Sequence, residues 1–330
     1  MKNIQMEIEI PEKLSGYTFY NDILPNIYNN IISKCFELDF DMSKTKLANP
    51  EGLINFLSAI LMINKKYNYI PKLKIPISKN LRAYLELTNF LDISRILNQE
   101  LFKIDSLTNL FYNKEKFEGF IPKIYGILTQ TNSNEHFSNI NKILENIKIS
   151  LNEKTGFMDE NEFRNFNIYT NLQSSLSQLI RNTIEHNCNY RTYNLLGFYM
   201  AQRTPYNTIE LAYSDIGKGF RDRIIEMINE HKDSEIEKYI TIQDKISDKK
   251  YLLRESELNP NLISIKTAVD FRSNSEIPGL FQIRKYTLSK NGSFFVHSGN
   301  YSVKYSNEKV SSKYYNSYFS GCHIRMELPI

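Results

Sequence analysis

Apolar residues change their spacing in a regular way over the first hundred residues. They recur at every second position in three short stretches, which is typical of β-strands: 2–10, 36–40 and 73–77. In the segments that follow each stretch they recur at three- and four-residue intervals, which is typical of helices: 17–34, 53–64 and 80–93. Strands and helices alternating in this way predict a small α/β domain over residues 1–105.

The second half of the chain carries the same two kinds of pattern in a less regular order. Helices are expected over 172–185 and 281–290, and strands over 193–202, up to Asp215, 293–297 and 323–328. Residues 106–165 are dense in Asn, Lys and Ser but keep a helical stripe of apolar residues, so we expect connecting helices there. A second α/β domain is predicted over 166–330.

The composition is that of a globular protein in a reducing compartment. Hydrophobic residues make up 41% of the 330 residues and charged residues 24%, which excludes a disordered or fibrous chain. The net charge is +4 with scattered basic residues, which argues against nucleic acid and anionic membranes as partners. The longest apolar run, 56–63, is far short of the roughly 20 residues that span a bilayer. Cys35, Cys188 and Cys322 are widely spaced, so we expect no disulfide scaffold or zinc site, and a cytoplasmic protein.

Three motifs in the second half contain residues suited to ligand binding. The first is a polar stripe near the end of the predicted helix 172–185. Gln178, Asn182, Glu185 and His186 fall on one helix face there, away from the apolar residues. Taken alone, a stripe of this kind is more often a solvated surface than a site.

The other two motifs are built around glycines. Asp215, Gly217 and Gly219 form an Asp-x-Gly-x-Gly sequence directly after an apolar strand, where glycine permits close backbone approach to a ligand. Gly279 and Leu280 open an amphipathic helix, whose free N–H groups and dipole favour an anion. The plainer interpretation of each motif is a tight turn or a helix start.

The order and spacing of these motifs resemble the GHKL family of ATP-binding domains. This family includes histidine kinases, type II topoisomerases, Hsp90, mismatch-repair ATPases and anti-sigma-factor kinases. The closing sequence from Gly321 to Pro329 is also similar to the last strand of the family. The resemblance covers roughly residues 165–330. It implies an α/β sandwich, a mixed sheet covered by helices on one face, that binds ATP and Mg²⁺.

The resemblance also implies roles for individual residues. Asn182 would ligate Mg²⁺ held by the ATP phosphates, because an amide oxygen suits this hard cation. Asp215 would accept a hydrogen bond from the adenine amino group. The remaining ATP-binding positions would be Glu185 and His186 along the pocket, Gly217 and Gly219 under the base, and Gly279 and Leu280 at the end of a lid.

Two departures from the family pattern bear on activity. Gln178 stands where hydrolysing members carry a general-base Glu, and an amide cannot take a proton from the attacking water. Fast Glu-dependent hydrolysis is therefore not expected. The lid residues 273–278 also lack the usual run of glycines, which predicts a stiffer or shorter lid.

The first domain bears a weaker resemblance to the STAS domains of anti-sigma-factor antagonists. The resemblance is carried by residues 36–43, 49–53 and 84–91. STAS domains present a phosphorylatable Ser or Thr at the start of the helix after the second strand. Asn49, Pro50 and Glu51 occupy that place here, so no phosphorylation switch is expected.

These patterns together predict a Mg-ATP-binding regulatory protein whose nucleotide state controls a protein partner. It would act as an anti-sigma-factor-type serine/threonine kinase or a slow ATPase. Two alternatives stay open: a non-hydrolysing adaptor or scaffold with a degenerate nucleotide pocket, and an atypical sensor histidine kinase. In the latter, His136 is the candidate phosphoacceptor. A homodimer also stays open.

Overall fold

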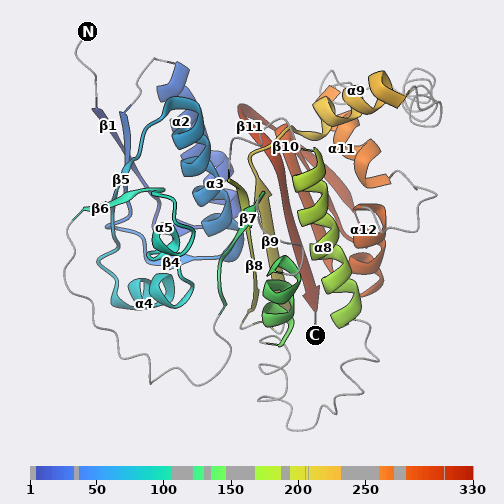
Figure 1. Cartoon of the computed structure of the whole chain (residues 1–330), viewed down its shortest axis with the longest axis horizontal. Coiled ribbons are helices and arrows are strands. Elements are labelled where there is room, and N and C mark those ends of the chain that lie inside the picture. The colour runs from blue at the N-terminus through green and yellow to red at the C-terminus, as the bar shows by residue number, and fades with distance from the viewer. Residues whose placement is uncertain are drawn as a thin grey trace.

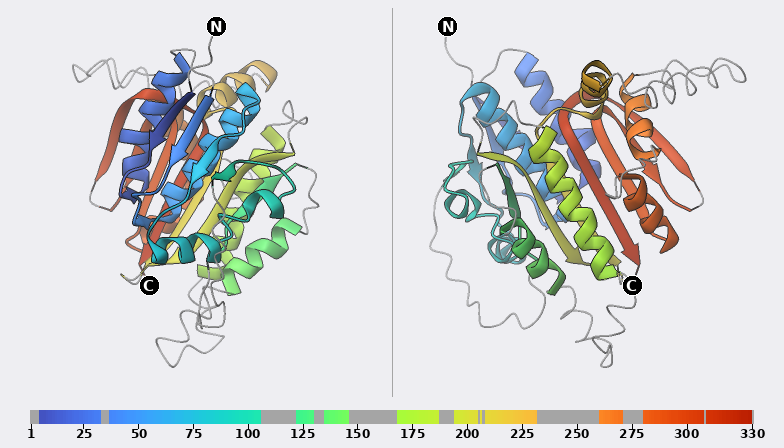
Figure 2. Two further views of the ribbon diagram at one scale, coloured as in Figure 1. Left: turned by 90° about the vertical axis from the view of Figure 1, so that its left-hand side faces the viewer. Right: turned by 45° about the vertical axis from the view of Figure 1, so that its right-hand side comes forward.

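The computed structural model describes residues 5–32, 37–105, 122–129, 135–145, 168–186, 194–204, 206, 208–231, 260–270, 280–307 and 309–329. These residues form four stacked layers, in the order sheet, helices, sheet, helices (Figures 1 and 2). The described residues thus form an α/β structure with a four-stranded parallel sheet, a five-stranded antiparallel sheet and a small two-stranded parallel ribbon.

The first sheet is parallel and its strands lie side by side in chain order. It consists of β1 (Gln5–Glu9), β3 (Glu37–Asp41), β5 (Lys72–Lys74) and β6 (Lys103–Asp105). Its apolar face carries Ile8, Phe40 and Leu73, which are neighbours across the strands. The opposite face is charged, and Lys74 there pairs with Glu7 at 2.7 Å. The two-sided pattern confirms the predicted strands. Among the described helices, those of the first half lie on the apolar face (Figures 1 and 2).

The helices of the first half begin at capping residues visible in the sequence. Ser15 caps a helical segment made of α1 (Gly16–Thr18), a π-helical turn η1 (Phe19–Ile23) and α2 (Leu24–Ile32). Asn49 caps α3 (Pro50–Tyr67) by accepting the Gly52 N–H at 2.9 Å. Ser78 caps α4 (Lys79–Leu87), which a short α5 (Ile93–Ile96) follows. A small ribbon of β2 (Lys13–Leu14) and β4 (Leu47–Ala48), which we did not expect, connects these elements.

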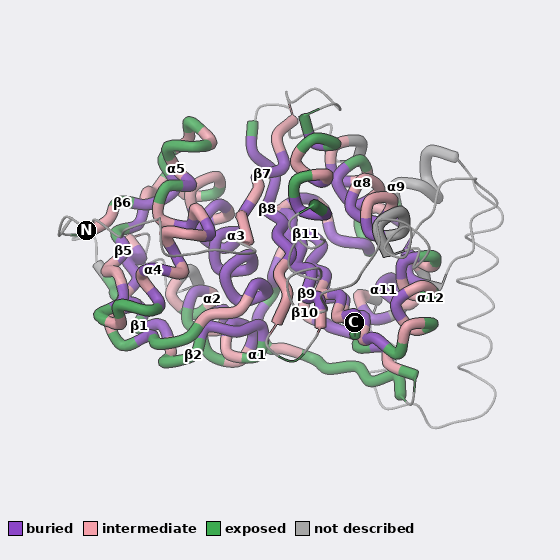
Figure 3. The backbone as a smooth tube through the Cα atoms, turned by 90° about the horizontal axis from the view of Figure 1, so that it is seen from below, coloured by how far each residue is buried: buried purple, intermediate pink, exposed green. Residues whose placement is uncertain are grey.

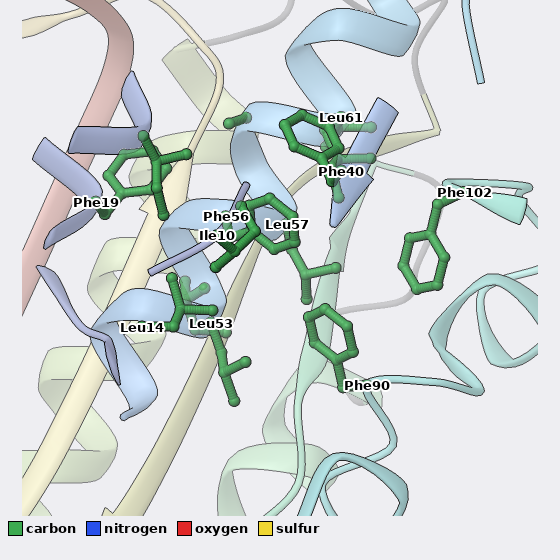
Figure 4. Packing of buried hydrophobic residues seen from close by; sticks show 14 of the residues in the cluster. Ile10, Leu14, Phe19, Phe40, Leu53, Phe56, Leu57, Leu61, Phe90 and Phe102 are labelled. Atoms are coloured by element: carbon green, nitrogen blue, oxygen red, sulfur yellow. The ribbon is translucent and has the colours of Figure 1, made fainter. Parts of the chain in front are cut away.

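Helix α3 is buried between the two sheets. Thirteen of its residues are buried, including polar ones. Toward the first sheet, the Phe56 ring meets Phe40 edge-on with ring centroids 5.0 Å apart (Figure 4). Toward the second sheet, the helix contacts β8 and β9, and the Ser58 hydroxyl donates to the Ser214 carbonyl. A helix that is apolar on nearly all sides is stable only in such an interior position.

The second sheet has the strand order β10-β11-β9-β8-β7. Its members are β7 (Tyr125–Leu128), β8 (Leu195–Arg203), β9 (Thr208–Asp215), β10 (Ser293–Tyr305) and β11 (Val310–Pro329). We expected a mixed sheet, but all pairings between its described strands are antiparallel. The reason is that β8–β9 and β10–β11 are hairpins with short connections, and β11 returns alongside β9.

Strand β7 lies in the stretch where we expected connecting helices. It forms the edge of the second sheet by pairing with β8, and a helix over 135–145 follows it. Its buried residues Gly126 and Ile127 pack within the fold. The four-residue strand is too short for its alternation to stand out against the surrounding Asn and Lys residues.

The outer layer of helices covers one face of the second sheet. It contains α8 (Ile168–His186), α9 (Phe220–His231), α11 (Pro260–Asp270) and α12 (Leu280–Ser289) (Figures 1 and 2). Helices on this face agree with the expectation. The inner face lies against α2 and α3 of the first half. The sheet is therefore covered on both sides, and the buried residues form a continuous purple band through the strands in Figure 3.

Two hydrophobic clusters fill the spaces between the layers. The inner cluster joins the first half to the second sheet, whose contribution includes Phe198, Met200, Ala212 and Phe319. The outer cluster joins the opposite face of that sheet to α8, α11 and α12. Because the inner cluster contains residues from both halves, neither half buries its apolar surface alone.

Polar contacts join the start of α3 to the second sheet. Arg325 on β11 pairs with Glu51 of α3 at 2.8 Å, and Asn49 donates to Glu210 of β9 at 3.1 Å. Burial raises the pKa of Glu210 to about 7, although nearby Arg325 opposes the shift. The first turn of α3, where a STAS domain would present its phosphorylation site, is thus buried against the second sheet.

Two fully buried histidines face each other across β10 and β11. His297 stacks on Tyr20 of η1 at a centroid distance of 4.3 Å. His323 accepts from the Ser214 hydroxyl at Nδ1, 2.5 Å away, and donates from Nε2 to the Ser320 carbonyl. Burial lowers the pKa of His297 to about 3 and lowers that of His323 well below its usual range. Both imidazoles are therefore neutral in the folded protein.

We predict that the folded protein loses stability as the pH falls from 7.5 to 5. Below about pH 6.5 the unfolded chain binds protons at both histidines that the folded protein does not bind, so the free energy of unfolding decreases. Glu210 acts in the opposite direction between its unfolded pKa and about 7, and Glu51 acts in the same direction as Glu210, because burial raises both pKa values and the folded state holds these protons more tightly. Urea unfolding at the two pH values should show that the histidines dominate.

The substitution His297→Phe removes one titrating group but keeps a ring against Tyr20. The difference in unfolding free energy between pH 7.5 and pH 5 should shrink by about 2 kcal/mol. A difference equal to that of the wild type would contradict a neutral His297 in the folded state.

Candidate nucleotide site

Asp215 ends β9 with a buried carboxylate that accepts bonds from several elements. Its Oδ1 accepts from the backbone N–H of Gly217 at 2.9 Å and of Cys322 at 3.3 Å. Its Oδ2 lies 3.1 Å from the hydroxyls of Thr183 and Tyr213. Each of these hydroxyls has one hydrogen to donate and also lies within hydrogen-bond distance of the Leu179 carbonyl. Protein groups therefore surround both oxygens of Asp215, with two backbone donors on Oδ1 and two hydroxyls beside Oδ2.

The tyrosine and cysteine beside Asp215 remain protonated. Burial raises the pKa of the Tyr213 hydroxyl well above its usual range, and the charge of Asp215 adds to the shift. The same two causes raise the pKa of the Cys322 thiol. Tyr213 can thus serve as a neutral hydrogen-bond donor to the carboxylate.

Glycines let the backbone close around this carboxylate. Gly321 has a φ of +96°, and a Cβ there would collide with the Asp215 carbonyl. A Cβ at Gly219 would lie 2.6 Å from the Ser298 hydroxyl, which holds the Phe220 N–H and the Gly321 carbonyl. Gly217 and Gly219 therefore lie where the sequence predicted a glycine turn, and their close neighbours are protein atoms.

The polar stripe of α8 is half-buried and bonded within itself. Gln178 donates from Nε2 to Oδ1 of Asn182 at 2.8 Å. This oxygen is the atom that the GHKL resemblance assigns to Mg²⁺. A cation at Asn182 would therefore have to displace the Gln178 amide.

Helix α8 reaches Asp215 through the residue next to Asn182. Thr183 bonds Asp215, and its hydroxyl also contacts Tyr213. Adjacent residues on a helix point about 100° apart. The two predicted nucleotide ligands thus lie on neighbouring elements joined at Thr183, without a direct bond between them among the described residues.

The other predicted residues are placed only in part. Glu185 and His186 end α8, and their side chains lie outside the described residues. Gly279 is also outside the described residues, whereas Leu280 begins α12 and packs into the outer hydrophobic cluster. Pocket-lining and lid functions for these four positions stay predictions.

Arg223 on α9 is a candidate site residue that the sequence analysis missed. Its Nη2 lies 3.9 Å from Asp215 Oδ2, and its side chain is only 12% exposed. Within the described structure, its Nε and Nη2 atoms are buried without a hydrogen-bond partner. The sequence signal is weak, since Arg221 lies two positions earlier and is exposed. Unpaired guanidinium N–H groups next to the predicted site can bind an anion.

The described residues give no support to a metal site, a membrane-spanning helix or a phosphoacceptor histidine. No group of three or more His, Cys, Asp and Glu side chains there is arranged to hold a metal ion. In the same part of the chain, no helix has the length and hydropathy to cross a membrane. His136 is buried, with Nε2 bonded to the Leu128 carbonyl, which is unfavourable for a phosphoacceptor.

Comparison with known proteins gives no assignment. No protein-family model matches the chain, and no curated protein matches it.

Replacing Asp215 by Asn should destabilise the fold. The amide can keep its oxygen toward the two backbone N–H groups and turn its NH₂ group toward the hydroxyls, but the charge that strengthens these bonds is lost, so we expect a loss of about 1–3 kcal/mol in unfolding free energy. Urea unfolding followed by circular dichroism measures this loss. The control Asp222→Asn, on the exposed start of α9, should stay within about 0.5 kcal/mol of the wild type. Equal stability of the two variants would show that the negative charge of Asp215 does not contribute to the free energy of unfolding.

Proposed function

We propose that the second half of the chain binds Mg-ATP and that the nucleotide state controls how the protein meets a protein partner. The proposal rests on the buried Asp215 at the end of β9, reached by α8 beside Asn182. The order of the sequence motifs supports the same pocket. The Arg223 guanidinium, with unpaired N–H groups beside Asp215, supports an anionic ligand there.

Binding would require two local changes. The adenine amino group needs an acceptor, so the hydroxyl of Thr183 or Tyr213 would have to turn away from Asp215 Oδ2. The Asn182 oxygen would also have to give up its hydrogen bond from Gln178 in order to bind Mg²⁺. Magnesium prefers oxygen ligands, and phosphate and water oxygens would fill its remaining positions. Magnesium would supply charge neutralisation for the phosphates. Both changes are side-chain rotations, which cost little compared with a backbone movement.

The fold offers a path from this pocket to the first half of the chain. The Ser214 carbonyl accepts a bond from Ser58 of α3, and the next residue is Asp215. Ser214 and Asp215 lie on opposite faces of β9 because side chains alternate along a strand. A nucleotide that shifts the end of β9 would therefore act directly on α3. This coupling supports a switch through differential contacts in two states.

The chemical fate of the nucleotide depends on Gln178. This amide cannot act as the general base for hydrolysis, so we propose phosphate transfer to a protein or slow turnover. A homodimer is also part of the proposal, because two copies of the chain would together form the surface that the protein partner meets.

A second candidate is a non-hydrolysing adaptor with a degenerate pocket. Two observations favour it: protein groups surround both oxygens of Asp215, and Asn182 is engaged by Gln178. Calorimetry separates the candidates, because an adaptor of this kind shows no heat of binding at millimolar ATP with magnesium. That result would remove the Mg-ATP proposal.

The substitution Asn182→Ala should remove the magnesium-dependent part of ATP binding. Without the amide oxygen, the dissociation constant measured by calorimetry should be the same with magnesium and with EDTA. The fold should be near native, since Asn182 is half-buried and makes one side-chain bond. The control Ser177→Ala, on the same helix, should bind as the wild type does. Full magnesium dependence in Asn182→Ala would contradict this assignment.

The substitution Gln178→Glu should raise ATP turnover. It restores a carboxylate as general base, and such groups contribute about 10²–10⁴-fold in rate, so a rise of at least about tenfold is expected. Phosphate release measures it. Gln173→Glu is the matched control, because Gln173 lies on the same helix but bonds to Asn141. Fast turnover in the wild type, with no response at position 178, would show that another group acts as the base.

A further inference from the structure

A pocket of about 230 Å³ opens on the inner face of the second sheet. It lies between the start of α1, the start of α3 and the β10–β11 hairpin. Asp215 faces the outer helices of the same sheet, so this pocket is separate from the proposed nucleotide site. Glu51 and Arg325, which line it, lie in segments that carry the two resemblances, but neither resemblance assigns a ligand to this pocket.

The floor of the pocket is a buried carboxylate with one oxygen free. Glu51 is 4% exposed, and its Oε2 accepts from Arg325 Nη1 at 2.8 Å. No hydrogen bond to Oε1 is formed within the described structure. A Cβ at Gly16 would overlap the Glu51 carboxylate, so glycine at this position is what leaves room for it. A carboxylate that lines a pocket with one oxygen lacking a protein donor favours a ligand that brings one, above all a cationic one.

The wall of the pocket is aromatic. Tyr20 contacts Phe295 and Tyr315, with ring centroids 5.8 Å and 5.4 Å apart. All three side chains line the pocket. Such a surface packs well against a flat apolar group and attracts a cation over its faces.

The rim of the pocket is basic. Lys313 is held by Asn21 and lies over the rings of Tyr17 and Tyr315, 5.4 Å and 4.9 Å from their centroids. Lys304 is exposed at the rim and makes no hydrogen bond or ion pair in the described structure. An ammonium group in this position can bind the anionic end of a ligand whose other end reaches Glu51.

We propose that this pocket binds a free amino acid with an aromatic side chain, its ammonium group on Glu51 and its carboxylate on Lys304. The pocket volume is that of about eight water molecules. This volume suits an aromatic amino acid and is too small to enclose a whole nucleotide. The side-chain ring lies on the wall of Tyr20, Phe295 and Tyr315. The two charged ends of the ligand match the two charged ends of the pocket.

Proton release is a second signature of this mode of binding. Burial raises the pKa of Glu51, with Arg325 opposing the shift. A ligand ammonium against Oε1 favours the ionised carboxylate, so binding at a pH near that pKa releases protons. Calorimetry in two buffers of different ionisation enthalpy measures the number released.

The primary test uses L-phenylalanine and two analogues that each lack one charge. Calorimetry on the full chain without nucleotide should show binding of L-phenylalanine. Phenethylamine, without the carboxylate, and 3-phenylpropionate, without the ammonium, should each bind at least about tenfold more weakly. Equal binding of all three would overturn the two-ended assignment. No binding of L-phenylalanine at 10 mM would overturn the proposal, and so would preferential binding of AMP.

Variants locate the site on the protein. Lys304→Gln, which changes an exposed residue, should weaken L-phenylalanine binding about tenfold without loss of stability. Glu51→Gln should remove detectable binding and the buffer-dependent proton release. Lys309→Gln is the matched control, an exposed lysine in the turn of the same hairpin that does not line the pocket. Binding that is the same in Lys304→Gln and the wild type would contradict the proposal.

The test is independent of the proposed nucleotide site. Asn182→Ala should bind L-phenylalanine as the wild type does, because Asn182 lies on α8 beyond the other face of the sheet. Failure of ATP binding with intact amino-acid binding would remove the nucleotide proposal alone.

Discussion

The structure depends on a helix that is buried on all sides from Pro50 to Leu61. Helix α3 lies between a parallel sheet and an antiparallel sheet, and its Phe56 and Ser58 contact opposite layers. Burial of this helix removes apolar surface from water on both sides at once, which is the dominant favourable contribution to folding. Neither sheet can cover its inner face without α3. The two halves of the chain therefore stabilise each other through one element.

The same arrangement explains the polar groups in the inner layer. Glu51, Glu210 and Arg325 are carried into the interface by elements whose apolar residues must be buried there. The ion pair between Glu51 and Arg325 offsets part of the desolvation cost, and the raised pKa values of both carboxyl groups show that the compensation is incomplete. At the other side of the interface the histidines stay neutral for the same reason. Incomplete compensation leaves Glu51 with an acceptor oxygen that a ligand can use.

Much of the local structure could be predicted from the sequence. The alternation of Ile8 with charged neighbours indicated a strand with one buried face, and the helix predicted over 53–64 corresponds to α3, which begins three residues earlier at Pro50. The end of β9 at Asp215 and the helix containing Asn182 were also predicted.

Other features could not be predicted from the sequence. Strand β7 was missed because its four residues show too few alternations of apolar and polar residues. The antiparallel second sheet was expected to be mixed from the GHKL resemblance, and hydrophobic spacing could not correct this, because it shows that a segment is a strand and not which neighbour it pairs with. Arg223 was missed because nothing local distinguishes it from Arg221.

The sequence by itself determined where most of the long helices and strands lie, because hydrophobic spacing acts over only a few positions. It also determined that a buried strand ends at Asp215 and that a turn with two glycines follows. Only the tertiary structure decided what those residues touch. Thr183 and Cys322 meet Asp215 from opposite directions in the chain, and Glu51 meets Arg325 across 274 positions. Contacts of this kind depend on how whole layers stack, and that stacking is set by the summed burial of many side chains rather than by any local pattern.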